Sequence, residues 1–151
     1  MQVLKFVLGN VETIEAIGAL PNLRDLSFRE ARNLKDLGDL QRFPRLRRLQ
    51  VSDQPKLPVV HVGARNTALE HLYLYSVPQL AALRGLAALP VLKSLFTYDS
   101  KLALPWSDLP KTLTHFQMMT KAIKGRVAHE ADVRAQGLTP AVHPDATFFY
   151  K

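Results

Sequence analysis

Apolar residues recur along the chain in a short pattern, apolar-x-x-apolar-x-apolar, that returns about every 23 residues. Residues 69–91 show it best: Leu69, Leu72 and Leu74 open the stretch, and leucines then recur at every third position from Leu80 to Leu89. The pattern begins at Val3, Leu23, Leu46, Leu69, Leu92 and Leu113, so successive starts lie 20, 23, 23, 23 and 21 residues apart. Six occurrences at nearly constant spacing indicate a repeat protein.

Each repeat predicts a short strand followed by a curved segment. Around Leu72 and Leu74 the apolar positions alternate with a period of two, which predicts a strand with one buried face. The following apolar residues are spaced by three, as in Leu34, Leu37, Leu40 and Phe43, and this spacing suits a short 3₁₀ or irregular helical arc. In the third repeat, residues 57–63 lack this spacing, so we expect an extended arc there.

Prolines mark where each arc ends. Pro21, Pro44 and Pro90 stand two residues before a pattern start, and Pro110 stands three before. Proline disfavours helix in the residue before it and cannot donate a ladder hydrogen bond. Because one strand and one arc cannot bury their leucines alone, successive repeats must stack.

With this period and pattern, the chain resembles the leucine-rich repeat family over residues 3 to about 120. The resemblance implies an α/β fold class: a right-handed solenoid of β/α or β/3₁₀ turns, with a curved parallel β-sheet on its concave face. The asparagine that the family usually has in the turn after the strand is missing. Ala31, Gln54, Val77 and Ser100 stand near that place.

The repeats predict two regions along the chain. Residues 1–120 form the repeat domain, whose first strand begins almost at the N-terminus and has no separate cap. Residues 121–151 break the pattern and are predicted to form a C-terminal cap. The cap consists of a short helix between Val127 and Gln136, which Gly137 ends, and an extended tail with Phe148, Phe149 and Tyr150.

Composition narrows the functional classes. The chain has 151 residues, is 47% hydrophobic and contains no cysteine, which excludes disulfides and thiolate zinc sites. It contains no apolar run long enough to cross a bilayer, and its first residues lack the apolar core and cleavage site of a secretory signal. We therefore expect a cytoplasmic protein without membrane association.

Motifs for catalysis, cofactors and metals are missing from the sequence. His129 and Glu130 are followed by Ala131, Asp132 and Val133, so the histidine that a zinc protease motif needs four residues later is a valine. His71 and His115 occupy the same strand position two repeats apart, about 10 Å, which is too far for one metal ion. We expect neither an enzyme nor a cofactor-binding protein.

The strand positions that point away from the core form the candidate binding surface. They are Lys5, Val7, Gly9; Asp25, Ser27, Arg29; Arg48, Gln50, Ser52; His71, Tyr73, Tyr75; Ser94, Phe96, Tyr98; and His115, Gln117, Met119. Tyr73, Tyr75, Phe96 and Tyr98 are predicted to form a two-by-two aromatic block, rimmed by His71, His115 and Met119. Asp25, Arg29 and Arg48 would add an electrostatic rim that helps to select a partner.

Three functional hypotheses follow. The first is a protein-binding module that uses the aromatic block, since aromatic residues are enriched in binding hot spots; the family resemblance makes an inhibitor or immunity-type role plausible. The second is RNA binding, because residues 23–68 hold ten Lys/Arg against five Asp/Glu, a net charge of +5. The third is a structural repeat that assembles through its N-terminal edge. The aromatic block could instead stabilise the sheet by cross-strand pairing or be covered by the C-terminal tail.

Overall fold

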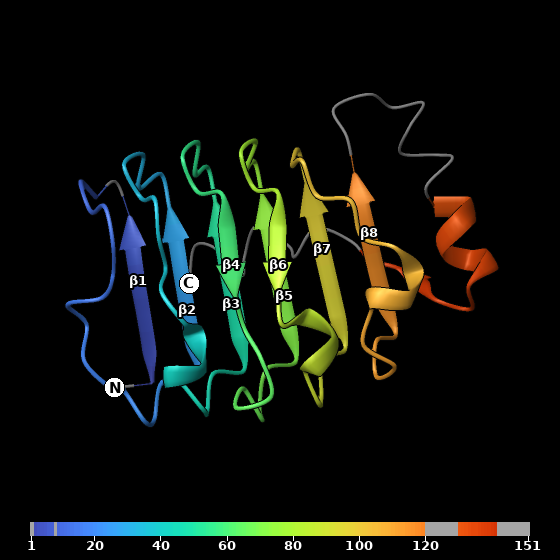
Figure 1. Cartoon of the computed structure of the whole chain (residues 1–151), viewed down its shortest axis with the longest axis horizontal. Coiled ribbons are helices and arrows are strands. Elements are labelled where there is room, and N and C mark those ends of the chain that lie inside the picture. The colour runs from blue at the N-terminus through green and yellow to red at the C-terminus, as the bar shows by residue number, and fades with distance from the viewer. Residues whose placement is uncertain (1, 8, 120–129, 142–151) are drawn as a thin grey trace.

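A parallel β-sheet forms one side of the molecule (Figure 1). The computed structural model describes residues 2–7, 9–119 and 130–141, and within these ranges the sheet has seven strands. In spatial order they are β1 (Val3–Val7), β2 (Asp25–Arg29), β3 (Arg48–Ser52), β5 (His71–Tyr75), β7 (Ser94–Tyr98), β8 (His115–Met119) and β9 (Thr139–Pro140). Every neighbouring pair is parallel, so the predicted parallel sheet is confirmed.

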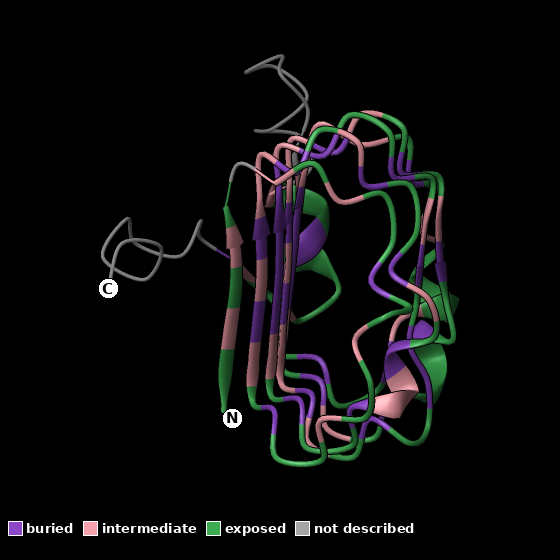
Figure 2. Ribbon diagram, turned by 90° about the vertical axis from the view of Figure 1, so that its left-hand side faces the viewer, coloured by how far each residue is buried: buried purple, intermediate pink, exposed green. Residues whose placement is uncertain are grey.

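Short return segments form the opposite side (Figure 2). They contain the 3₁₀ turns η1 (Leu40–Arg42), η2 (Leu86–Ala88) and η3 (Trp106–Asp108). They also contain a small parallel sheet of β4 (Val59–His61) and β6 (Ala82–Arg84). The predicted 3₁₀ arcs are confirmed at η1 and η2, and the extended third arc is confirmed at β4, whereas β6, which lies inside a predicted 3₁₀ arc, was not predicted. Among the described residues, no helix is long and apolar enough to cross a membrane.

The core lies between these two sides and consists of the repeated leucines. The inward strand positions Leu26, Leu49, Leu72 and Leu95 are fully buried. The residues spaced by three in the arcs are buried too: Leu34, Leu37, Leu40, Phe43, Leu80, Leu83, Leu86 and Leu89. The three-residue period therefore marks the inner surface of the return segments, as the sequence predicts.

The register of the first strand differs from the prediction by two residues. The repeat pattern placed Phe6 opposite Leu26, whereas the structure pairs Phe6 with Phe28 and Leu4 with Leu26. Because strand side chains alternate with a period of two, a shift of two residues leaves the same side chains on the same face. The observed register stacks the rings of Phe6 and Phe28 with their centroids 4.9 Å apart. The outward residues of β1 are consequently Val3, Lys5 and Val7, and Gly9 is not among them.

The described part of the predicted cap, residues 130–141, continues the parallel sheet. Residues 130–135 are helical, and Gly137 follows with φ of +75°. The N–H of Leu138 donates to Val133 O at 3.2 Å, and that of Gly137 donates to Arg134 O at 3.0 Å. This is a Schellman motif, so the predicted stop at Gly137 is confirmed. Val127, the predicted helix start, and the aromatic tail Phe148–Tyr150 lie outside the described residues.

One buried asparagine joins the second and third repeats. Asn66 donates from Nδ2 to Leu40 O at 2.8 Å and to Phe43 O at 3.4 Å, and its Oδ1 accepts from the N–H of Gly63 at 3.0 Å. Its side chain occupies the position that Phe43 and Leu89 fill in neighbouring repeats. It gives the N–H of Gly63 an acceptor within the extended third arc, and it gives Leu40 O and Phe43 O, which already accept from backbone N–H groups, a second donor.

A left-handed residue follows four of the strands. Glu30, Asp53, Ser76 and Asp99 have φ between 53° and 55° and stand 23 residues apart. The N–H groups of Glu30, Asp53 and Ser76 donate to the last residue of the next strand, at 3.2, 2.9 and 2.9 Å. The strand ladder therefore continues into these three turns and holds Glu30, Asp53 and Ser76 in a conformation that costs roughly 1–2 kcal/mol outside glycine.

This turn gives a stability prediction at Ser76. Ser76→Val should lower the free energy of unfolding by about 1–2 kcal/mol, because a β-branched residue is strained at positive φ. Ser76→Gly should be neutral or stabilising, since glycine adopts this conformation without a steric penalty. Urea denaturation measures both. Ser107→Val, at an exposed position of η3, is the control. Equal effects of valine at positions 76 and 107 would contradict the argument.

Candidate functional site

The outward positions of the large sheet form three columns, which together we call the strand face. The strand pairing gives Val3, Asp25, Arg48, His71, Ser94 and His115 in the first column, Lys5, Ser27, Gln50, Tyr73, Phe96 and Gln117 in the second, and Val7, Arg29, Ser52, Tyr75, Tyr98 and Met119 in the third. Every predicted site residue thus belongs to this sheet face. For Met119, only the backbone pairing with Tyr98 is described.

The four aromatic residues lie together as predicted. Tyr73 is in register with Phe96, and Tyr75 with Tyr98. The rings of Tyr75 and Tyr98 stack with centroids 4.8 Å apart, and His71 lies parallel to Tyr73 with centroids 6.1 Å apart. Such pairs contribute about 0.5–1.5 kcal/mol beyond the area they bury. The tyrosines of this aromatic block are half-buried.

The middle column is more buried than the strand alternation predicts. Phe96 and Gln117 are each 1% exposed, so the expectation of an exposed Phe96 ring is wrong. Gln50 is buried in the same column, and Ser52 beside it in the third. Alternation fixes which face a side chain lies on, but not whether that face is covered.

Some buried polar atoms on this face have no hydrogen-bond partner among the described residues. Both amide atoms of Gln117, Oε1 and Nε2, are buried without one, as is Nδ1 of His71. An unsatisfied buried group of this kind costs about 1–3 kcal/mol. Gln117 was predicted to lie on this face but not to be a site residue, and its burial arises only from the tertiary structure.

The predicted electrostatic rim is divided between two columns. Arg48 Nη1 lies 3.6 Å from Asp25 Oδ1 across the β2–β3 pair in the first column. Arg29 is in the third column, and its Nε lies 3.5 Å from Glu30 Oε1. Oppositely charged neighbours on paired strands stabilise a sheet modestly. The rim therefore presents both positive and negative charges at two edges of the strand face.

Glu70 is a charged centre that the sequence analysis missed. Its carboxylate lies 3.2 Å from Arg47 Nε, 3.5 Å from Lys93 Nζ and 3.7 Å from His71 Nε2. Arg47, Glu70 and Lys93 stand 23 residues apart, each immediately before a strand. This equivalent position in successive repeats could have predicted the ion pairs from the sequence. Burial alone would raise the pKa of Glu70, but the Arg47 hydrogen bond and the charges of Arg47 and Lys93 lower it overall.

Two side chains of the face have shifted pKa values. Burial, followed by the charge of Arg48, lowers the pKa of His71 below its usual value, although Glu70 acts in the opposite direction. Burial raises the pKa of the Tyr73 hydroxyl, which Arg48 partly offsets. Both shifts favour the neutral side chain, so His71 and Tyr73 contribute an uncharged aromatic surface at neutral pH.

His71 and His115 do not form a metal site with each other. His115 is exposed and separated from His71 by Ser94, and its Nδ1 lies 2.9 Å from the hydroxyl of Thr114. In the part of the chain that the structure describes, no group of three or more His, Cys, Asp or Glu side chains could hold a metal ion. The strand face instead offers aromatic surface, amide groups and mixed charge, which are suited to recognition.

Basic residues of the second and third repeats make contacts within the molecule. Arg42 donates to Ile14 O at 2.8 Å and lies over the Phe43 ring, 4.9 Å from its centroid. Arg45 donates to Asn22, and Arg47 binds Glu70. These arginines are therefore used to join neighbouring repeats.

Comparison of the chain with models of protein families, with curated proteins and with solved structures finds no match. A functional assignment must therefore come from the geometry described above.

The lowered pKa of His71 predicts a pH dependence of stability. Because the folded state disfavours protonated His71, this residue favours folding fully above its unfolded pKa of about 6.5, and the contribution declines as the pH falls below that value. An NMR titration should give a lower midpoint for the His71 ring in the native chain than in the urea-unfolded chain. A midpoint that is equal or higher in the native chain would contradict the assignment.

Proposed function

We propose that the chain is a leucine-rich repeat solenoid that binds another protein on its strand face and catalyses no reaction. The observation that carries the proposal is the group of three half-buried tyrosines of the aromatic block, Tyr73, Tyr75 and Tyr98, which lie on two adjacent strands around the buried Phe96. Tyrosine supplies large contact area with few rotatable bonds and is enriched in interface hot spots. A stoichiometric inhibitor or immunity-type protein in the cytoplasm is a role compatible with such a scaffold.

The architecture supports the family part of the proposal. Stacked repeats of about 23 residues place parallel strands on one side and 3₁₀ or extended arcs on the other. The chain departs from the leucine-rich repeat pattern in the turn after the strand, where the asparagine typical of the family is missing. In the third repeat, Gln54 is buried there and donates to Ser52 O at 2.7 Å, so it supplies a side-chain bond to the turn backbone. The strand face would then be the concave face of the solenoid.

The contacts of the basic residues favour a protein over a nucleic acid. Arg42, Arg45 and Arg47 donate to groups within the molecule, and Arg48 lies beside Asp25. Nucleic-acid binding needs several cations directed at phosphates along one surface. A mixed-charge rim around an aromatic centre is instead typical of a protein interface.

A photocrosslinking experiment tests the proposal. A benzophenone amino acid is placed at Tyr75 on the strand face or at exposed Lys111 away from it, and the full chain is irradiated in an extract of its native cells. One protein should be crosslinked at position 75 and not at position 111. Tyr73→Ala, next to the probe, should reduce this crosslink more than about tenfold, as expected for an aromatic hot spot.

Other outcomes would overturn the assignment. Crosslinked RNA would support the nucleic-acid hypothesis, and equal crosslinking at both positions would indicate nonspecific adhesion. Tyr73→Phe retains the ring and should retain most of the crosslink. Circular dichroism and urea denaturation establish that each variant remains folded.

The β1 edge supports a second candidate, assembly with another copy of the chain. β1 pairs only with β2 among the described strands, and its outward residues Val3 and Val7 are 50% and 58% exposed. An edge strand with apolar side chains can pair with another strand. Lys5, at its centre, is the kind of residue that opposes such pairing.

Analytical ultracentrifugation tests this second candidate. If β1 mediates assembly, the sedimentation coefficient of the native chain should rise with concentration, and Val3→Lys should abolish the rise by adding charge to the edge. Ala103→Lys, at an exposed position remote from β1, should leave the rise unchanged. A monomer at all concentrations would exclude this assembly.

A further inference from the structure

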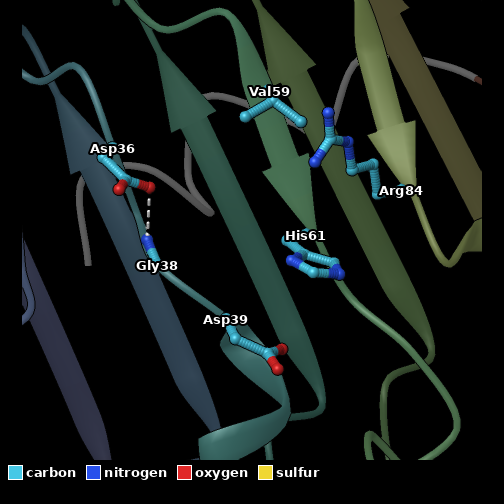
Figure 3. Close-up of a pocket in the computed structure, with 6 residues that line it drawn as sticks. All are labelled: Asp36, Gly38, Asp39, Val59, His61 and Arg84. Atoms are coloured by element: carbon cyan, nitrogen blue, oxygen red, sulfur yellow. Dashed lines mark hydrogen bonds between the residues drawn. The ribbon is translucent and has the colours of Figure 1, made fainter.

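A hollow of about 240 Å³ lies on the small sheet, on the side of the molecule opposite the strand face. It is lined by Asp36, Gly38, Asp39, Val59, His61 and Arg84, which come from three successive repeats (Figure 3). Since drug-sized ligands usually occupy pockets of about 300–1,000 Å³, this hollow suits a ligand of few atoms.

The backbone places an acidic, an imidazole and a basic side chain in one row. Asp39 forms a parallel bridge with His61, and His61 is paired with Arg84 across β4 and β6. Neighbouring parallel strands are about 4.8 Å apart, so the backbones of Asp39 and Arg84 are separated by roughly 10 Å. This separation holds the negative and positive ends of the row apart.

The acidic end of the hollow is positioned by local hydrogen bonds. Asp36 Oδ1 accepts from the N–H of Gly38 at 2.7 Å. Asp39 accepts from the N–H of Gln41 at 3.0 Å and from its side-chain amide at 3.3 Å. A carboxylate has about four acceptor sites, so both groups keep capacity for a further donor.

The basic end is Arg84, with His61 beside it. Within the described residues, neither side chain makes a hydrogen bond or an ion pair. In Figure 3, the Asp36 carboxylate and the Arg84 guanidinium project into the hollow from opposite sides, with Val59 as an apolar wall. The hollow therefore carries separated charges of both signs that the protein does not neutralise itself.

We propose that this hollow binds a small zwitterion, a free amino acid, whose carboxylate meets Arg84 and whose ammonium group meets Asp36, while Asp39 adds negative charge to the hollow. Guanidinium binds carboxylate in a planar, bidentate geometry, and carboxylates accept the three donors of an ammonium group. A ligand with one charge would satisfy one end and leave the other repelled or unpaired. This inference is independent of the proposed function, because the two surfaces lie on opposite sides of the molecule.

An NMR titration of the full chain with glycine and with β-alanine tests the proposal. Saturable shifts are expected at the Gly38 amide and the Arg84 Nε–H for at least one of these ligands. Arg84→Gln and Asp36→Asn should each weaken binding by at least about tenfold, corresponding to one lost charge-assisted hydrogen bond. Both positions are exposed, so the variants should fold, which circular dichroism checks.

Matched controls make the result decisive. Arg32→Gln removes the same charge at an exposed position outside the hollow and should leave the affinity unchanged. Acetate and methylammonium, which each carry one of the two charges, should bind at least about tenfold more weakly. Absence of saturable shifts with both zwitterions, or equal weakening by Arg32→Gln, would overturn the proposal. Tighter binding of inorganic phosphate, strengthened by Asp36→Asn, would also overturn it and indicate a simple anion site.

Discussion

The structure depends on one constraint: a single repeat cannot bury its own leucines. Leu49, Leu72 and Leu95 are fully buried only because the strands of neighbouring repeats stand in register beside them. The same stacking supplies the backbone ladder, since each strand donates to and accepts from the next. Hydrophobic burial and hydrogen bonding therefore require the same neighbour, and stability accumulates repeat by repeat.

This constraint also explains the irregular positions. Ser76 keeps a left-handed conformation because its N–H completes the ladder to Tyr98 O. Asn66 replaces an apolar residue where the third arc is extended and needs side-chain hydrogen bonds. Both residues depart from the repeat pattern or from ordinary backbone preference, and in both cases a group of an adjacent repeat provides the compensation.

Stacking also gives the molecule two chemically different surfaces. On the strand face, parallel register collects aromatic residues from β5 and β7 into one block, with charged pairs at its edges. On the small sheet, the same register aligns Asp39, His61 and Arg84 across a hollow. Residues 22 or 23 positions apart in the chain become neighbours, so recognition surfaces arise from equivalent positions in successive repeats.

The sequence by itself determined the repeat, the faces of the strands and the positions of the core leucines, because a period of 23 and the alternation within each strand are local properties. It therefore placed Tyr73 beside Phe96 and Tyr75 beside Tyr98 correctly. Only the tertiary structure decided the register of β1, because a shift of two residues leaves every side chain on the same face. It also decided the burial of Phe96 and Gln117, which depends on what covers the face. The Glu70 ion pairs and the hollow at Arg84 were also visible only in the tertiary structure, since they depend on side-chain positions across repeats.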